Sequence, residues 1–290
     1  MKFGSWLRMR VQLLAHPQFT RNPAGAIVRR LLWKAIWSRR AQIRFRTQYG
    51  FTVEGSPADI GMGSLFYRGQ YEWNELELWQ KLLEQPVATV VDVGANIGLY
   101  SLVAAAACRR RGNDGVRIFG FEPNPAECGK FRHNVAINGY RTVQVEQVAL
   151  SDRMGSCRMA VPPPGLGAFG HLLQAGEARD RHDAEVEVAT VDLDGWCAGQ
   201  GLERIDLMKL DVEGHELAVL AGAEKLLARH AIGALLMEVG HGEWRRSVAL
   251  LQAHGYAIHA IGDGGRLEAY AEERVGDWCN VVALAPKAQG

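Results

Sequence analysis

The central part of the chain alternates between short apolar runs and longer segments with helical spacing. The runs are typical of strands buried in a parallel sheet, and they cover 89–93, 117–121, 143–148, 205–210 and 234–239. Helical periodicity covers 99–110, 125–138, a segment from about 216, and 244–255. Runs at 256–261 and 280–285 are expected to close the sheet as an antiparallel hairpin. This order predicts an α/β fold with a doubly wound, mostly parallel seven-stranded sheet and a C-terminal antiparallel hairpin strand.

One long segment breaks the alternation after the third strand. It contains Pro162, Pro163 and Pro164, followed by Gly165, Gly167 and Gly170. Such punctuation predicts an irregular insertion, with one strand expected at 185–191. His171 in this glycine-rich part is either a lid residue or simply solvated.

The N-terminal part is expected to be a separate helical extension. Asn22 and Pro23 are typical of a helix start. One apolar stripe then follows, formed by Ile27, Val28, Leu31, Leu32, Ala35 and Ile36. A short hairpin is expected within 48–66 and a helix at 71–83. The chain is therefore divided into a basic helical extension, residues 1–66, and a larger domain, residues 67–290.

Charge is distributed unevenly along the 290 residues. The first 53 residues contain 11 basic and no acidic residues, so the remainder has 22 basic and 32 acidic residues, a formal charge of −10. The acidic remainder argues against a nucleic-acid partner. The basic helix either lies on anionic lipid or an acidic partner, or packs across the larger domain, and the sequence favours the second interpretation.

The bulk composition is that of a globular protein, with 48% hydrophobic and 22% charged residues. No apolar run approaches the roughly 18 residues of a membrane span, and Arg8 and Arg10 interrupt any signal-peptide core. The expected location is cytoplasmic, with peripheral contact at the inner face of the membrane as the variant that the basic helix allows. Five scattered cysteines without a Cys-x-x-Cys pair indicate neither a disulfide framework nor a zinc site.

The segment Val90–Gly98 predicts a ligand site where a buried strand turns into a helix. Gly94 matches the first glycine of a dinucleotide motif, but Asn96 occupies the second glycine position. Asp92 would also bring a carboxylate close to a pyrophosphate. S-adenosylmethionine (SAM) has no phosphate and carries an ammonium and a sulfonium, so it suits this acidic strand end better.

Acidic residues follow three of the predicted strands. Asp92, Glu122 and Asp211 should converge, because the carboxyl ends of parallel strands meet at one edge of the sheet. Glu122 lies about 24 residues beyond Gly98, which is close to the spacing of a ribose-binding acid.

A second acidic block, Lys209–Glu216, crowds another turn from strand to helix. Glu216 there is best explained as a capping residue. Asp211, Glu213, Glu238 and His241 are the candidates for a general base. A magnesium-like ion held by Asp211 and Glu238 is the alternative, and a metal is not predicted.

Together these blocks resemble the FkbM-type family of SAM-dependent methyltransferases. The matching segments cover about residues 70–240 and include 71–72, 91–100, 121–125 with Asn134 and Asn138, 149–152, 205–216 and 237–238. The resemblance implies a class I, Rossmann-like fold. The cofactor-binding set that it implies is Glu72, Asp92, Gly94, Ala95, Asn96, Gly98, Glu122, Asn124, Ala149 and Asp211. In that set Glu122 would bind the ribose, Asn124 and the backbone near Ala149 would flank the adenine, and Asp211 would lie beside the methyl donor.

The resemblance also implies transfer of a methyl group to a hydroxyl of a sugar, a glycan or a secondary metabolite. Residues before 66 and the insertion 153–184 match nothing in the family, so acceptor choice is expected to depend on them. Two other functions stay open, a SAM-binding scaffold without catalysis and a nicotinamide-dependent oxidoreductase. Methylation of a nitrogen or a protein is a further alternative, and the sequence leaves the acceptor and the oligomeric state undetermined.

Overall fold

The computed structural model describes residues 23–59, 61–68, 72–173, 180, 183–240, 242–275 and 279–286. The chain forms two compact units, Met1–Tyr71 and Glu72–Gly290. The division expected after residue 66 stays a prediction, and the two units are described one at a time.

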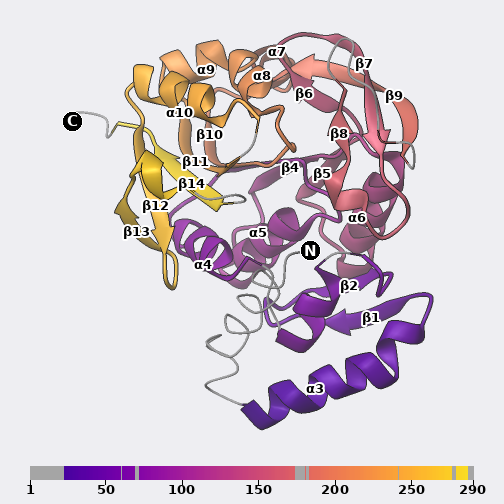
Figure 1. Cartoon of the computed structure of the whole chain (residues 1–290). Coiled ribbons are helices and arrows are strands. Elements are labelled where there is room, and N and C mark those ends of the chain that lie inside the picture. The colour runs from indigo at the N-terminus through magenta and orange to yellow at the C-terminus, as the bar shows by residue number, and fades with distance from the viewer. Residues whose placement is uncertain are drawn as a thin grey trace. The chain divides into compact units, whose positions relative to one another are not determined.

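The larger unit is built on an eight-stranded sheet with the order β13-β12-β14-β11-β10-β3-β4-β5 (Figure 1). Its strands are β3 Thr89–Val93, β4 Arg117–Phe121, β5 Val143–Glu146, β10 Ile205–Leu210, β11 Ile232–Val239, β12 Ala257–Gly262, β13 Arg266–Ala269 and β14 Cys279–Leu284. The five neighbouring strands β11, β10, β3, β4 and β5 are parallel to one another. Strand β14 lies between β11 and β12 and is antiparallel to both. The predicted doubly wound α/β fold is confirmed, with one strand more than expected.

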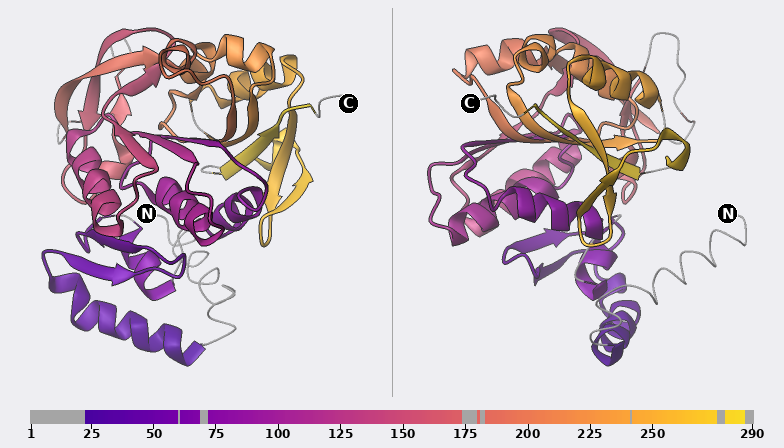
Figure 2. Two further views of the ribbon diagram at one scale, coloured as in Figure 1. Left: turned by 180° about the vertical axis from the view of Figure 1, so that it is seen from behind. Right: turned by 90° about the vertical axis from the view of Figure 1, so that its left-hand side faces the viewer.

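Helices cover both faces of this sheet (Figures 1 and 2). One face carries α4 Trp73–Leu82, α5 Leu99–Arg110 and α6 Pro125–Asn138, and the other carries α7 Leu193–Gly199, α8 Glu216–Ala221, α9 Glu224–Ala228 and α10 Trp244–Ala253. Helix α6 has the predicted bounds because both of its ends are fixed locally. The Asn124 side chain accepts a hydrogen bond from the Ala126 amide, and Gly139 ends the helix at φ 62°.

The centre of the sheet is almost entirely apolar. Every residue of β3 is buried, and five of the six residues of β10 are buried. Asp92 and Lys209 are the ionisable side chains buried within these two strands, each only 1% exposed. Strands buried on both faces carry such apolar sequences, so the two buried charges mark the part of the sheet where the site lies.

Two predictions about the larger unit were wrong in detail. The two C-terminal runs do pair antiparallel, as β12 and β14, but they do not form a hairpin, because β13 lies between them in the chain and pairs with β12. The insertion contains ordered strands, because β6 Ala149–Ser151, β7 Gly155–Val161, β8 His171–Leu172 and β9 Ala184–Asp192 form a second sheet with the order β6-β9-β7-β8. The strand predicted at 143–148 ends earlier, at Glu146. The next strand, β6, belongs to the second sheet.

The smaller unit contains the predicted basic helix and a hairpin. Helix α3 spans Pro23–Ala35, a turn η1 spans Trp37–Arg39, and strands β1 Ile43–Arg46 and β2 Thr52–Gly55 pair antiparallel before the π-helical turn η2 Ser64–Arg68. The hairpin was expected within 48–66, but its first strand already begins at Ile43. Rings of Trp33, Trp37 and Phe45 lie 5.1–5.5 Å from the ring of Phe66. Among the described residues, no helix is both long and apolar enough to cross a membrane.

Candidate functional site

The candidate site lies where β3 and β10 run side by side and their helices leave to opposite faces of the sheet. Ligands in open α/β sheets bind at such a switch point. The Asp211 amide donates a hydrogen bond to the Val93 carbonyl over 3.0 Å, so the two strand ends are tied together. A Cβ atom on Gly94, which has φ +77°, would lie 1.7 Å from the Asp211 carbonyl oxygen. Only glycine fits this crossing.

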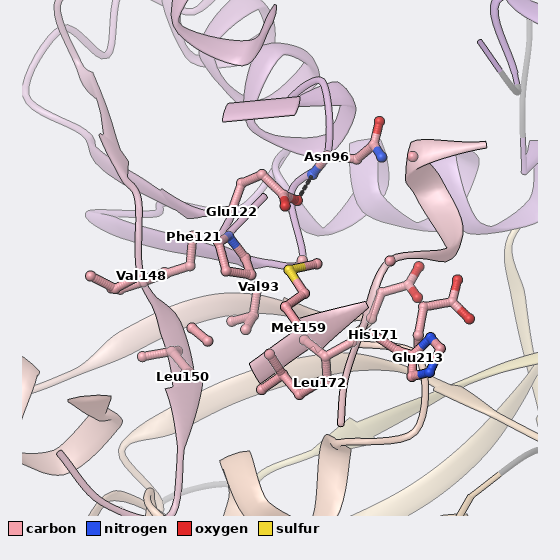
Figure 3. Close-up of a pocket in the computed structure, with 17 residues that line it drawn as sticks. Val93, Asn96, Phe121, Glu122, Val148, Leu150, Met159, His171, Leu172 and Glu213 are labelled. Carbon is pink, nitrogen blue, oxygen red and sulfur yellow. Dashed lines mark hydrogen bonds between the residues drawn. The ribbon is translucent and has the colours of Figure 1, made fainter. Parts of the chain in front are cut away.

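A pocket opens directly above this crossing (Figure 3). Its free space, part of which is continuous with solvent, is about 530 Å³. One side comes from the ends of β3 and β4, with Asn96 and Glu122, and another from the turn after β10, with Asp211 and Glu213. The remaining lining residues are Val93, Gly94, Phe121, Pro123, Val148, Ala149, Leu150, Met159, Gly167, Gly170, His171, Leu172 and Val212.

Glu122 is held in place by two backbone amides. Its Oε2 accepts a hydrogen bond from the Asn96 amide and its Oε1 accepts one from the Asn124 amide, both over 2.8 Å (Figure 3 shows the first). Asn96 reaches this position with φ 51°, a conformation that asparagine tolerates better than most residues. Burial raises the pKa of Glu122 to about 7, although both hydrogen bonds oppose the shift. Each oxygen still has a lone pair for a ligand hydroxyl.

Two residues expected to touch the cofactor have other partners. The Asp92 carboxylate accepts hydrogen bonds from the Ser101 amide and hydroxyl over 2.9 and 2.7 Å, and it does not line the pocket. It ties β3 to the first turns of α5, and burial raises its pKa to about 6. Asn124 caps α6 and is likewise absent from the lining, and its buried Nδ2 has no partner among the described residues.

Of the remaining expected cofactor residues, Ala149 lines the pocket and the others support it. The Ala95 amide donates to the Phe121 carbonyl over 3.0 Å, which joins the β3 loop to β4. Gly98 has φ +89°, and a Cβ there would lie 2.0 Å from the Phe131 ring. These two residues shape the loop without lining the cavity.

Three carboxyl groups gather beside the pocket. One oxygen each from Asp211, Glu213 and Glu238 lies within 4.8 Å of the others. Lys209 supplies one positive charge, with Nζ 2.9 Å from the Asp211 carboxylate and 3.1 Å from the Asn280 side-chain oxygen. Burial alone would lower the pKa of Lys209, but Asp211 and Glu72 outweigh it and raise that pKa.

The shared charge in this cluster raises two of its pKa values. Burial, and then the negative charge of Asp211, raise the pKa of Glu213 to about 8 and that of Glu238 to about 10. Three carboxyl groups at this distance cannot all be ionised next to a single lysine. At neutral pH the two glutamates are therefore mainly protonated beside the charge of Asp211, which pairs with Lys209.

Glu72 is connected to this network through Tyr100 and does not line the pocket. It begins α4 with φ 50°, and its carboxylate accepts a 2.6 Å hydrogen bond from the Tyr100 hydroxyl. The Tyr100 ring lies 5.3 Å from Lys209 Nζ. Burial raises the pKa of Glu72 to about 7, and the charge of Lys209 opposes this shift.

The turn after Asp211 is held by its own side chains. Glu216 accepts hydrogen bonds from the Val212 and Gly214 amides, both over 3.2 Å, as the capping interpretation expects. His215 Nε2 lies 2.9 Å from the Ser151 hydroxyl, and burial lowers its pKa. His241, a candidate base, lies outside the described residues.

Sequence reasoning did not assign several residues that the structure places at the site. Lys209 was visible as a lysine inside an apolar run, which is a signal for a paired buried charge. Met159 and Leu172 reach the pocket only because β7 and β8 pair, which no local pattern shows. His171, which the sequence left as either a lid residue or a solvated one, lines the pocket beside them. The described lining residues include no lysine or arginine, so the pocket suits a neutral or cationic ligand better than a pyrophosphate.

Comparison with known proteins identifies relatives of this chain. A family model described as "Methyltransferase FkbM domain" matches residues 92–258, more than half of the chain. The "31-O-demethyl-FK506 methyltransferase FkbM" of Streptomyces tacrolimicus is 31% identical over 212 residues, which cover 62% of this chain and 76% of that protein. The "2-O-methyltransferase NoeI" of Sinorhizobium fredii is 31% identical over 161 residues, 51% of this chain and 62% of that protein.

A solved structure, described as methyltransferase FkbM from Methylobacillus flagellatus KT, aligns with 15% identity and a TM-score of 0.43. The alignment covers 93% of this chain and 60% of that one. The family match itself rests on the sequence, and it contains the strand β3 loop, Glu122, the Asp211 turn and Glu238. The chain belongs to the FkbM methyltransferase domain family.

Proposed function

We propose that this protein is a SAM-dependent O-methyltransferase that acts on a hydroxyl group of a sugar, a glycan or a secondary metabolite. The observation that carries the proposal is an acidic pocket without lysine or arginine among its described lining residues, at the switch point of a methyltransferase-family sheet. SAM supplies an electrophilic methyl group on a sulfonium and contains no phosphate.

The described residues fit this cofactor in three respects. Glu122 offers a fixed carboxylate whose free lone pairs can accept the two ribose hydroxyls. Phe121, Val148 and Leu150 form an apolar wall for a flat base. Asp211 would bring negative charge to a sulfonium in the pocket, and the loop of Gly94 and Asn96 would face the methionine portion.

The acceptor oxygen must lie in line with the methyl group and lose its proton as the new bond forms. Asp211 is the base that we assign, because it keeps the negative charge of the acidic cluster and Lys209 holds its carboxylate. Glu213 and Glu238, mainly protonated, can donate hydrogen bonds that orient the acceptor. A cation entering the pocket lowers both pKa values and makes these glutamates available as acceptors too.

The same three carboxyl groups could instead hold a divalent cation that acidifies the hydroxyl, since oxygen ligands at this separation suit Mg²⁺ or Ca²⁺. An assay with and without a chelator separates the two mechanisms. Activity that survives chelation leaves proton transfer to the side chains, and activity that returns only with added Mg²⁺ assigns it to the metal.

The choice of a hydroxyl acceptor is supported by two relatives, one named as a 2-O-methyltransferase and one named as a methyltransferase of a 31-O-demethyl compound. Acceptor selection would depend on the insertion, because Met159, His171 and Leu172 form the side of the pocket that the core sheet does not supply. We expect a lid-like role for this side.

The test combines binding and turnover. Calorimetry with SAM and S-adenosylhomocysteine should show binding of both, and radiolabelled SAM should transfer its methyl group to a member of a panel of glycans and polyketide alcohols. Binding without transfer to any acceptor would favour the scaffold function. A rise in melting temperature with NADH and none with SAM would instead identify an oxidoreductase.

A further inference from the structure

Helix α3 exposes an unusually concentrated group of aliphatic side chains. Nine large hydrophobic residues are exposed in the described part of the chain, and five of them lie within ten consecutive positions. Their exposed fractions are 47% for Ile27, 53% for Val28, 61% for Leu31, 40% for Leu32 and 45% for Ile36. Scattered exposed apolar residues are ordinary, but a contiguous group marks an interaction surface.

The group, which we call the aliphatic stripe, consists of one face of α3 and the residue that directly follows the helix (Ile27, Val28, Leu31, Leu32, Ala35 and Ile36). With 3.6 residues per turn these positions fall within half of the helix circumference. Trp33 lies on the other half, is 9% exposed, and packs its ring 5.3 Å from that of Phe66. The smaller unit thus holds α3 by the face opposite the stripe.

The charge around the stripe has a single sign. Residues 23–46 contain seven basic residues and no acidic one, and the basic residues are Arg29, Arg30, Lys34, Arg39, Arg40, Arg44 and Arg46. Residues 54–290, by contrast, carry ten more acidic than basic residues. The net positive charge of the chain is therefore concentrated in the segment that contains the aliphatic stripe, although Arg44 pairs with Glu54 in the hairpin.

We propose that α3 docks on the surface of a lipid bilayer that contains anionic lipids. The stripe enters the boundary between headgroups and acyl chains, and the flanking arginines and Lys34 contact lipid phosphates. A basic amphipathic helix of this kind lies in the plane of the interface, and each basic side chain near the surface adds electrostatic attraction.

A lipid surface explains the combination better than a protein partner does. The stripe is made of aliphatic side chains, whereas protein interfaces are enriched in aromatic anchors, and both tryptophans near it are used to hold Phe66. The sequence alone favoured packing of the stripe against the larger unit. The aliphatic composition of the stripe and the one-signed charge of its segment are what favour lipid.

The test is flotation of the full-length protein with vesicles of phosphatidylcholine alone and of phosphatidylcholine with phosphatidylglycerol, in low and high salt. We expect binding to the anionic vesicles, at least tenfold weaker binding to neutral ones, and a loss of binding in high salt. The double variant Ile27→Ser/Leu31→Ser should bind at least tenfold more weakly, and so should Lys34→Glu/Arg39→Glu.

Matched controls come from the larger unit. Met154→Ser/Leu267→Ser removes two other exposed apolar side chains, and Lys225→Glu reverses one exposed charge, so both should float like the wild type. Circular dichroism of every variant checks that it is folded.

Absence of binding to anionic vesicles overturns the proposal, as does equal binding by the stripe and control variants. If the wild type is a dimer that the stripe variants dissociate, and no vesicle binding occurs, a second copy covers the stripe and the proposal is again wrong. A stripe variant that only lowers the melting temperature of the larger unit would show packing within the chain. None of these measurements uses SAM, so they stand or fall separately from the proposed function.

Discussion

Lys209 shows how a single residue connects the core of the sheet to the site. Its side chain is 1% exposed, yet its ammonium reaches the Asp211 carboxylate and the Asn280 amide oxygen at the edge of the pocket. A buried charge is tolerated only when it is paired and hydrogen-bonded. The pair also determines which carboxyl group of the acidic cluster stays ionised, so a core residue sets the chemistry of a surface pocket.

Replacing Lys209 by methionine should therefore damage both stability and the site. We expect Lys209→Met to lower the free energy of unfolding by about 3 kcal/mol, because it leaves Asp211 without its partner. Urea unfolding measures the change. Lys225→Met, at an exposed lysine, is the control and should change little. A stable Lys209→Met protein would show that Asp211 is protonated or solvated instead.

Glu122 permits a test of the cofactor role. Glu122→Gln keeps the shape of the side chain but removes its charge. The glutamine NH₂ group also replaces one of the two oxygens that accept hydrogen bonds from the Asn96 and Asn124 amides. We expect the affinity for SAM and S-adenosylhomocysteine to fall by roughly 1.5–3 kcal/mol, measured by calorimetry. The control Glu146→Gln changes the acid at the end of the neighbouring strand, outside the pocket lining. Unchanged affinity in Glu122→Gln would exclude a ribose-binding role.

At the scale of elements, the start of α6 supports the pocket through Glu122. Asn124 both caps this helix and donates its amide to Glu122. Asn124→Ala should lower the free energy of unfolding by about 1 kcal/mol, and Gln252→Ala on the exposed side of α10 serves as its control. The backbone amide survives in the variant, so SAM affinity should fall by less than in Glu122→Gln. A fall as large as in Glu122→Gln would mean that the Asn124 side chain itself contacts the cofactor.

Elements with strong local signals were predicted to the residue. Strands β3, β4 and β10 and helices α5 and α6 have the expected bounds. Their apolar runs, and end signals such as Asn124, Pro125 and Gly139, depend only on residues close together in the sequence. Strand β13 was missed, since all four of its residues are exposed and it has no apolar alternation. The sheet of the insertion was missed because β7 pairs with β9 across a segment rich in proline and glycine.

The site was predictable to a similar extent. Glu122, Asp211 and Glu213 line the pocket because acids at the ends of parallel strands meet at one edge. Asp92 shared that signal, but Val93 follows it on the strand, and its carboxylate turns to Ser101. Which way a side chain points at a strand end depends on partners far away in the sequence, so spacing alone could not separate Asp92 from Glu122.

At the scale of the whole molecule, five carboxyl groups among the described residues have a raised pKa, all in the larger unit. They are Asp92, Glu72, Glu122, Glu213 and Glu238, with pKa values of about 6, 7, 7, 8 and 10. Burial is the largest cause in each case. A protein usually gains stability as its carboxyl groups ionise, and this set reverses that dependence.

The direction of this pH dependence follows from the number of protons bound in the folded and unfolded states. Between their ordinary values near 4 and the raised values, these groups hold protons in the folded state that they release on unfolding, so the folded state loses stability as pH rises. His215, whose pKa is lowered, opposes this only below about 6.5. We therefore expect the urea midpoint to fall steadily from pH 5.5 to pH 8.5 at constant ionic strength. Glu238→Gln should flatten the slope, because that position then binds no proton in either state, whereas Glu203→Gln at an exposed acid should leave it unchanged. Two outcomes would contradict this expectation: a urea midpoint that rises with pH, and a Glu238→Gln slope equal to that of the wild type. Either would show that the acidic cluster is ionised in the folded protein, so that Asp211 does not carry its negative charge alone.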